Sequence, residues 1–268
     1  MSEAIGFRNV RKSFRRRGGE LPVIDGADFA LARGEFVSVL GPSGCGKSTL
    51  LNMAAGFETA DSGEVLAGGA PVTGPDHTRG VVFQQYAVFP WLTVADNIAF
   101  GLRLAACGIP RDRHAAIVER YIGLMGLRGF ENAYPKELSG GMRQRVAIAR
   151  AYAPGPELLL MDEPFAALDA QTRESMQELL HDIQLTERRT VMLITHSVEE
   201  ALFLSHRVVV MTPRPSRVSE IVPVGIPFPR TPETRLSPEF IGLRRRLEEL
   251  LRGLSAAQAS TPKEGRAA

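Results

Sequence analysis

A glycine-rich segment at residues 41–49 has the composition and spacing of a phosphate-binding loop. Its sequence, GPSGCGKST, matches G-x-x-x-x-G-K-[ST] and lies between a predicted strand and a predicted helix, as that motif requires. The glycines allow backbone conformations that direct successive N–H groups toward a triphosphate. We expect Lys47 to reach the terminal phosphates and Ser48 to ligate Mg²⁺. The residues of this predicted loop are Gly41, Pro42, Ser43, Gly44, Cys45, Gly46, Lys47, Ser48 and Thr49.

Two adjacent carboxylates follow the apolar segment LLLM at residues 158–161. Asp162 and Glu163 would lie at the carboxyl end of a strand, where open α/β sheets bind their ligands. Asp162 is suited to hold Mg²⁺, commonly through water, and Glu163 is placed to polarise an attacking water. His196 ends another apolar segment, TVMLITH, and is a candidate donor to the γ-phosphate. An ordinary acidic loop and a structural histidine are the alternatives for these residues.

A second candidate phosphate site lies further along the chain, in LSGGMRQRVAIARA at residues 138–151. Ser139 stands where a helix is predicted to start, and Gly140 and Gly141 leave the backbone uncovered beside it. Free N–H groups and the positive end of the helix dipole would attract an anion there. Because the first loop is already complete, the residues alone leave open which phosphate this second site holds.

The elements that position these residues follow an α/β pattern. Five short apolar segments predict strands at residues 35–41, 80–85, 157–164, 190–196 and 207–213. Their unbroken apolar character is typical of a parallel sheet that helices cover on both faces. Amphipathic helices alternate with them, for example at residues 171–188, which indicates an α/β fold.

Helical signals replace strand signals between residues 85 and 156, which predicts a helical subdomain inserted into the α/β core. The proline-punctuated residues 211–238 are predicted to be extended. After them, apolar residues at helical spacing from Phe240 to Leu254 predict a last amphipathic helix. The tail SAAQASTPKEGRAA has nothing to bury and is predicted to be disordered.

The composition and charge of the chain limit the classes of function that it could have. Of the 268 residues, 44% are hydrophobic and 23% are charged, which is ordinary for a globular protein with a core. The net charge of +2 argues for neither nucleic acid nor an anionic membrane as a partner. Two cysteines cannot form a disulfide framework and fit a reduced setting. No apolar run approaches the roughly 18 residues that a membrane helix needs, so we expect any membrane role to come through a partner.

The motifs together resemble those of ATP-binding cassette ATPases over about residues 3–225. The phosphate loop, LSGGM, LLLMDEP, ALD at residues 167–169 and His196 occur in the order and spacing of that family. The resemblance implies a P-loop NTPase fold that binds ATP and Mg²⁺. It implies a RecA-like core with an antiparallel β subdomain and an α-helical subdomain inserted at about residues 86–156. A C-terminal extension with an amphipathic helix at residues 226–254 and a disordered tail at residues 255–268 would follow.

The resemblance also answers the question of the second phosphate site. In that family two copies pair head to tail, and each ATP lies between one phosphate loop and the signature segment of the other copy, as a two-fold dimer requires. Ser139, Gly140, Gly141 and Met142 would then contact the γ-phosphate of ATP on the opposite subunit. Met142 departs from the glutamine usual in the family, so we expect altered fine tuning and retained activity. Asp169 resembles the dimer-interface aspartate.

Two further positions match the family's nucleotide site. Phe14, in VRKSF, resembles the aromatic residue that stacks on adenine, with a plain core phenylalanine as the alternative. Gln84 resembles the glutamine that meets Mg²⁺ and water and senses the transmembrane partner; Gln85 is the weaker candidate. The predicted metal ligands are thus Ser48, Gln84 and Asp162, and the predicted catalytic residues are Glu163 and His196.

The absence of a membrane span and of a second cassette fits an importer subunit whose permease is a separate chain. Residues 86–102 resemble importer segments that form the groove for a permease helix, and Phe89, Pro90 and Trp91 would suit that contact, although a small core is the alternative. The SGGM segment and the residues that follow Met211 look like those of the nitrate, sulfonate and taurine uptake group.

The resemblance therefore implies an ATPase that energises uptake of a small anionic solute. It would lie peripherally on the cytoplasmic face of the cell membrane, with integral-membrane permease subunits as partners and, indirectly, a periplasmic or extracellular solute-binding protein. No nucleic-acid partner is expected. The alternatives are a soluble cassette ATPase that acts on nucleic acid or ribosomes and a small-molecule kinase. The first usually has tandem cassettes, coiled-coil insertions or basic stretches, and the second has no use for LSGGM.

Overall fold

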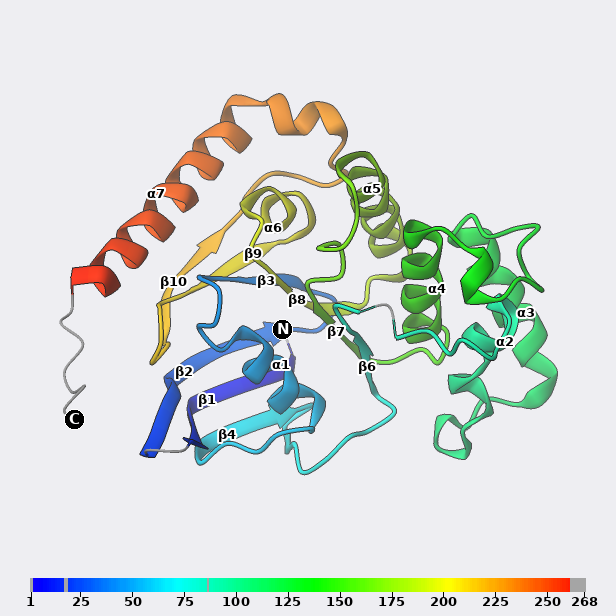
Figure 1. Ribbon diagram of the computed structural model, residues 1–268, viewed down its shortest axis with the longest axis horizontal. Helices are drawn as coiled ribbons and strands as arrows, with labels where there is room; N and C mark the ends of the chain where they lie inside the picture. The colour runs from blue at the N-terminus through cyan, green and yellow to red at the C-terminus, as the bar shows by residue number, and fades with distance from the viewer. Residues whose placement is uncertain (1, 17–18, 86, 261–268) are drawn as a thin grey trace.

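Two β-sheets form the centre of the protein, and helices surround one of them (Figure 1). The structure is a computed structural model that describes residues 2–16, 19–85 and 87–260. The larger sheet has six strands in the order β10-β9-β3-β8-β7-β6, and the smaller has four in the order β2-β1-β4-β5. No helix of these described residues is long and apolar enough to cross a membrane.

The larger sheet confirms the five predicted apolar strands. They are β3 (Phe36–Leu40), β6 (Arg79–Val82), β7 (Leu158–Asp162), β8 (Thr190–Thr195) and β9 (Arg207–Met211). Each pairs in parallel with its neighbour among these five, whereas β10 (Val218–Pro223) pairs with β9 in antiparallel orientation. Both faces of this sheet are covered. On β8, Val191 and Leu193 contact one core cluster and Met192 and Ile194 the other, which is why the strand is apolar without interruption.

The smaller sheet is antiparallel and closes the second core cluster over helix α1 (Lys47–Ala55). Its strands are β1 (Glu3–Arg16), β2 (Gly19–Ala32), β4 (Ser62–Ala67) and β5 (Ala70–Pro71). Buried residues of β1 and β2, such as Phe7 and Phe29, stack with ring centroids 4.5 Å apart. The α/β fold with an antiparallel β subdomain is therefore as expected.

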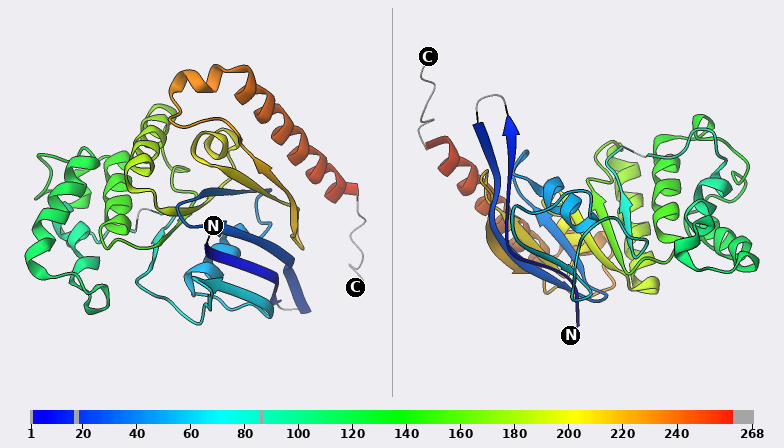
Figure 2. Two further views of the ribbon diagram at one scale, coloured as in Figure 1. Left: turned by 180° about the vertical axis from the view of Figure 1, so that it is seen from behind. Right: turned by 90° about the horizontal axis from the view of Figure 1, so that it is seen from below.

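The remaining helices cover the other face of the larger sheet or extend from it. They are α2 (Val94–Ala99), α3 (Arg111–Leu124), α4 (Gly140–Tyr152), α5 (Ala170–Glu187), α6 (Val198–Leu204) and α7 (Pro238–Ser260), with short 3₁₀ turns at Gly101–Arg103, Ala105–Cys107, Pro135–Glu137 and Pro232–Leu236. Helices α2, α3 and α4 lie together at the end of the molecule away from β1, β2 and β4 (Figure 2). Helix α7 begins near α5 and runs along the outside of α6 and β10 (Figures 1 and 2).

The C-terminal part of the chain differs from the prediction in two places. Residues 211–238 are not extended throughout, because they contain β10 and the turn Pro232–Leu236. The tail was expected to be disordered from residue 255, but α7 continues to Ser260. Residues 255–260 read SAAQAS, and alanine is the best helix former, so the helix continues beyond its last apolar contact. Residues 261–268 lie outside the described part of the chain.

Candidate functional site

The predicted phosphate loop connects the end of β3 to the first turn of α1. Gly44 (φ 73°) and Gly46 (φ 110°) have left-handed backbone conformations that residues with a Cβ rarely adopt. A Cβ on Gly46 would also lie 2.8 Å from Val23 Cγ1, so both conformation and space require glycine there. The loop is thus shaped by its glycines to present backbone N–H groups at the start of α1.

Lys47 is buried, and its ammonium group is held by the loop itself. Its Nζ donates to the carbonyl oxygens of Gly41 (2.8 Å) and Pro42 (3.1 Å). Neither partner carries a charge, so the positive charge of Lys47 is free to interact with an anion bound by the loop. Cys45 is buried beside it, and burial raises the pKa of its thiol, which suits a small space-filling residue.

A cavity of about 370 Å³ adjoins the loop. Phe14, from β1, lines it together with the loop residues, as the predicted adenine contact requires. Its lining residues are Phe14, Arg16, Leu21, Val23, Ser43, Gly44, Gly46, Lys47, Ser48, Thr49, Glu163 and Arg214. The sequence prediction missed Arg214, and it favoured a solvated turn over a phosphate contact for Arg16. The position of Arg214 just after β9 was the available signal, because the carboxyl ends of these parallel strands meet at one edge of the sheet.

Asp162 and Ser48 form the oxygen-rich part of this site. The Ser48 hydroxyl donates to the Asp162 carboxylate, which ends β7. Burial raises the pKa of Asp162, while this hydrogen bond and the nearby Lys47 oppose the increase. A hydroxyl and a carboxylate side by side are hard oxygen ligands of the kind that Mg²⁺ prefers, so these two residues fit a magnesium ion.

Glu163 and His196, predicted as the catalytic pair, come together from the ends of β7 and β8. Glu163 Oε2 lies 3.1 Å from His196 Nδ1. Glu163 has a φ of 44°, rare for a residue with a side chain, and its N–H donates to the Ile194 carbonyl at 2.9 Å. This turn directs the Glu163 side chain into the cavity that the phosphate loop lines.

Two buried residues, Thr195 and Glu200, hold the loop that carries His196, and the sequence prediction did not identify them. Thr195 Oγ1 donates to Glu200 Oε2 at 2.6 Å and accepts a hydrogen bond from the N–H of Ser197 at 2.9 Å. Burial raises the pKa of Glu200, and Thr195 and the nearby Arg173 partly oppose the increase. These bonds hold the residues on both sides of His196.

The signature segment, LSGGM at residues 138–142, starts helix α4. Ser139 caps the helix, because its Oγ accepts the Met142 N–H at 3.2 Å. Gly141 lies against α5, where a Cβ would come within 2.6 Å of Thr172 Cγ2. Asp169 caps α5 by accepting the Thr172 N–H at 3.0 Å, so the segment and Asp169 lie on two helix starts that touch.

The structure does not bring the signature segment to the phosphate loop of the same chain. Ser139 is exposed and, with Gly140, Gly141 and Met142, lies outside the lining of the cavity. Helix α4 lies beside α5 and is separated from α1 by β6 and β7 (Figures 1 and 2). Met142 packs half-buried against the core, which explains how an apolar residue is accommodated here. Gln84, just after β6, is also exposed and does not line the cavity.

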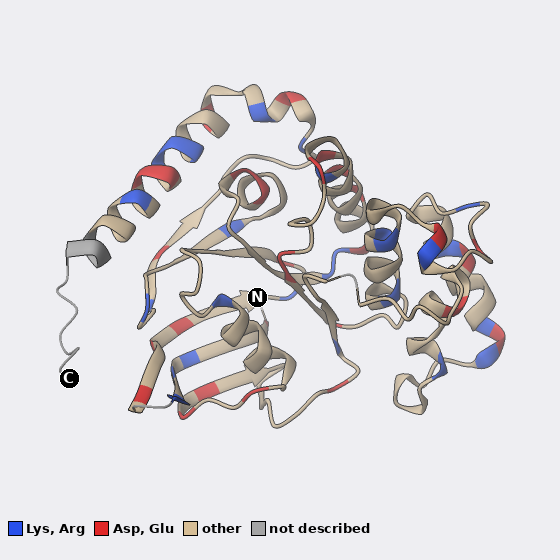
Figure 3. Ribbon diagram, viewed as in Figure 1, with Lys and Arg blue, Asp and Glu red and all other residues tan. Residues whose placement is uncertain are grey.

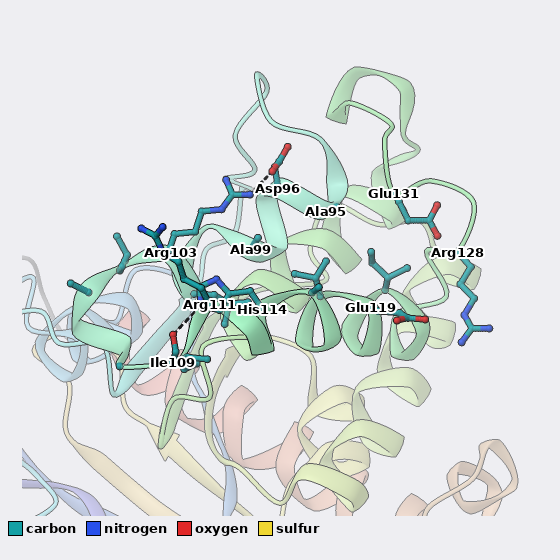
Figure 4. A pocket seen from close by; sticks show the side chains of 17 residues that line it. Ala95, Asp96, Ala99, Arg103, Ile109, Arg111, His114, Glu119, Arg128 and Glu131 are labelled. Atoms are coloured by element: carbon teal, nitrogen blue, oxygen red, sulfur yellow. Dashed lines mark hydrogen bonds and ion pairs between the residues drawn. The ribbon is translucent and has the colours of Figure 1, made fainter.

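A second, larger cavity of about 1140 Å³ lies among the helices at the far end of the molecule (Figure 4). Residues of α2, α3 and the turns between them line it, with Asp96 and Arg103 paired at 2.5 Å on its rim. His114 and Ile109 also line it, and His114 Nε2 lies 3.0 Å from the Ile109 carbonyl. Leu104, also in the lining, is 51% exposed.

The segment before α2 forms a rigid platform of residues 89–93. Asn97, fully buried, donates to the carbonyls of Phe89 (3.1 Å), Leu92 (3.0 Å) and Thr93 (2.9 Å), and its Oδ1 accepts the Phe89 N–H at 2.8 Å. Trp91 is held on this platform with 70% of its surface exposed. An aromatic residue fixed in this way and left open to solvent is typical of a binding surface. Tyr86, which begins the predicted groove segment, lies outside the described residues.

Residues 24–166, which include the phosphate loop, the signature segment and the Asp162–Glu163 pair, match the family described as ABC transporter. The chain belongs to the ABC transporter family. As an ABC cassette it is an ATP-binding ATPase, and the resemblance inferred from its motifs is confirmed.

Relatives of the cassette match over most of their length. An ATP-binding protein of Brucella abortus biovar 1 is 56% identical over 247 residues, which cover 92% of this chain and 93% of that protein. The taurine import ATP-binding protein TauB of Chromobacterium violaceum is 48% identical over 244 residues, 88% of this chain and 92% of that protein. The structure of the ATP-binding cassette MJ0796, a dimer in a post-hydrolysis state with ADP and Pi bound, is 29% identical; the match has a TM-score of 0.71 and covers 82% of this chain and 98% of that one.

Proposed function

We propose that this cassette is the ATP-hydrolysing subunit of an importer whose permease is a separate chain. The observation that carries the proposal is the meeting of the phosphate loop, the Ser48–Asp162 pair and the Glu163–His196 pair at the carboxyl ends of β3, β7 and β8. Phosphate binding, metal binding and activation of water are thereby served by one site. The importer assignment is supported by the 48% identity to a taurine import ATP-binding protein.

In this mechanism the chain's own residues bind the phosphates and orient the water. Backbone N–H groups of residues 41–49 and the Lys47 ammonium hold the phosphates of ATP, and Phe14 stacks on adenine. Ser48 and Asp162, and Gln84 as the resemblance implies, would hold Mg²⁺, which would neutralise charge on the phosphate oxygens. Glu163 accepts a hydrogen bond from the attacking water, and His196 orients Glu163 and donates to the γ-phosphate.

The signature segment would complete the site of a second copy. Ser139 is exposed and lies outside the cavity that the chain's own phosphate loop lines, so this start of α4 is available to a nucleotide on a partner. A head-to-tail pair with two-fold symmetry places each segment against the opposite loop and Asp169 near the interface. The dimeric MJ0796 cassette supports this arrangement.

The platform at residues 89–93 and the cavity beside α2 and α3 would receive a helix of the permease. Trp91 and Leu104 supply exposed apolar surface, and Asp96, Arg103 and Glu119 supply charge around it, which suits an amphipathic helix. The cassette would lie peripherally on the cytoplasmic face of the membrane, where ATP is available. The solute would be a small anion such as taurine, another sulfonate or nitrate, delivered by a periplasmic or extracellular binding protein.

Purification from detergent-solubilised membranes tests this function. We expect the cassette to copurify with an integral-membrane protein, and cells that carry only Glu163→Gln to lose uptake of labelled taurine, an alkanesulfonate or nitrate. Trp91→Asp should abolish copurification. The control Leu236→Asp changes a residue that is 76% exposed and lies outside the platform and cavity, and it should retain copurification. Recovery of the cassette with ribosomes or nucleic acid and with no membrane protein would contradict the proposal.

The alternative of a cassette that acts on nucleic acid or ribosomes receives no support from the surface. Basic and acidic residues are interspersed over most of the ribbon (Figure 3). Helix α4 carries basic residues alone, but Arg143, Arg145 and Arg150 are half-buried. Many exposed arginines are paired with carboxylates, for example Arg33 with Glu157 at 2.9 Å and Arg244 with Glu248 at 2.9 Å. A continuous basic stripe, which nucleic-acid binding requires, is therefore not built on these elements.

A further inference from the structure

Arg214, in the turn between β9 and β10, lies beside the phosphate loop. Strand β9 ends at Met211, beside the loop: a Cβ on Gly41 would lie 3.0 Å from Met211 Cβ. The chain then turns through residues 212–217 and returns as β10. Arg214, in the middle of this turn, lines the same cavity as Lys47 and Ser48.

The turn is closed by its own hydrogen bonds and is anchored to β2 through Ser216. Within it, the Thr212 N–H donates to the Arg217 carbonyl at 2.9 Å, and the Arg217 N–H donates to Thr212 Oγ1 at 3.0 Å. Ser216 is fully buried, and its N–H donates to the Val23 carbonyl on β2 at 2.8 Å. The Ser216 carbonyl accepts the Asp25 N–H at 2.8 Å. The turn that carries Arg214 is therefore anchored to the backbone of one strand, β2.

The Arg214 guanidinium lies directly over the phosphate loop. Its Nη2 is 3.3 Å from the point where a Cβ on Gly44 would be, so it approaches the loop at one of the glycines with a left-handed backbone. Within residues 2–16, 19–85 and 87–260, no hydrogen bond or ion pair engages this guanidinium. Some exposed arginines have carboxylate partners, such as Arg217 with Asp25 at 2.9 Å, whereas others, such as Arg245, have no ion pair among the described residues.

The charges around the cavity are unbalanced. Arg16, Lys47 and Arg214 bring three positive charges to its lining, and Glu163 brings one negative charge. Like charges gathered around a cavity repel one another unless an anion lies among them. A guanidinium adds two parallel N–H donors, which match the oxygens of a phosphate group better than an ammonium does.

We propose that Arg214 is a nucleotide-binding residue whose guanidinium donates to the phosphate chain of the nucleotide held by residues 41–49. The role rests on the proposed function, since it assumes that this cavity is the ATP site. Phosphate is favoured over the base because Arg214 contacts the glycine loop, whereas the predicted base contact, Phe14, belongs to β1. The segment after β9 thereby joins the phosphate loop as part of one site.

Calorimetric titration of the purified full chain with MgADP and with inorganic tripolyphosphate tests this role. We expect Arg214→Gln to weaken both ligands about tenfold, the loss that removal of one charge-assisted contact to phosphate gives. Arg214→Lys should retain part of the affinity, because it keeps the charge and loses the paired donors. The control Arg245→Gln removes an exposed arginine on α7, away from the cavity, and should leave both affinities unchanged.

The outcomes separate this inference from the proposed function. If the parent chain binds neither probe, the cavity is not an ATP site and the proposed function fails. If the parent binds and Arg214→Gln stays within about twofold for both probes, the assignment of Arg214 is wrong. If Arg214→Gln weakens MgADP binding and leaves tripolyphosphate binding unchanged, Arg214 contacts the nucleoside, and the proposed phosphate contact is wrong. Because Arg214 is exposed, thermal unfolding without ligand should be the same for the variant and the parent.

Discussion

Replacing Gly141 by alanine should force the signature segment away from helix α5. The new Cβ would lie 2.6 Å from Thr172 Cγ2, about 0.8 Å inside the 3.4 Å at which ordinary van der Waals contact begins. Thr172 has little freedom to yield, because its N–H is held by the Asp169 carboxylate at 3.0 Å and its hydroxyl also bonds to that carboxylate, which restrains the side-chain rotamer. Overpacking by one methyl group costs about 1–3 kcal/mol, while the better helix propensity of alanine offsets up to about 1 kcal/mol of that.

A double-mutant cycle removes the propensity effect from the measurement. Thr172→Ser deletes the methyl group that clashes and keeps the hydroxyl. By urea denaturation, Gly141→Ala should cost about 1–3 kcal/mol more in the parent than in the Thr172→Ser background. The ATPase rate of the single variant should fall and that of the double variant should recover, because the start of α4 carries Ser139. A coupling energy near zero would refute the steric argument.

Four further changes test separate parts of the site. Glu163→Gln should keep ATP binding and stall hydrolysis, so that an ATP-bound dimer accumulates in gel filtration; normal turnover would rule out the assigned role. Lys47→Ala should lower the hydrolysis rate by about 10²–10³, as removal of one preorganised donor does, and a rate within the error of the parent would exclude a phosphate contact. Ser139→Arg should abolish turnover and leave the nucleotide affinity of the monomer nearly unchanged in calorimetry; loss of monomer affinity would mean that the segment acts within its own chain. Burial raises the folded-state pKa of Glu200 above the unfolded value of about 4.3, so the folded state binds the proton more tightly and stability declines as pH rises through that range. Glu200→Gln, which cannot titrate, should therefore gain stability relative to the parent as pH rises above the unfolded value of about 4.3 in denaturant titrations, and a difference that stays constant with pH would contradict this.

The strands of the larger sheet and the site at their ends were predictable because both depend on local sequence. Unbroken apolar segments specify strands covered on two faces, and Asp162 and Glu163 directly follow one of them. The phosphate loop is equally local, since its glycines, lysine and serine lie within nine residues. Such features need no knowledge of how distant segments meet.

The antiparallel sheet was expected only through the family resemblance, and β1 shows why. Its pairing with β2 shifts register several times, Asn9 has a φ of 46°, and its burial does not alternate regularly. A strand with these irregularities lacks the period of two that reveals a half-buried strand in a sequence.

Contacts between residues far apart in the chain could not be predicted from the sequence. Arg214 lies against Gly44, which is 170 positions away in the chain, and Gly141 lies against Thr172, which is 31 positions away. The local sequence around these residues does not indicate which distant residue each one contacts. The exposed position of Gln84 likewise depends on the path of the chain after β6. These features follow from packing, which a single sequence does not specify.

The claim on which the mechanism depends is that each nucleotide site is divided between two copies of the chain. The most direct measurement is the ATPase rate per subunit as protein concentration is lowered, with the dimer fraction followed by sedimentation under the same conditions. We predict that the rate per subunit falls in proportion to the dimer fraction, while the nucleotide affinity of the monomer persists. An undiminished rate per subunit in a fully monomeric sample would contradict the divided site.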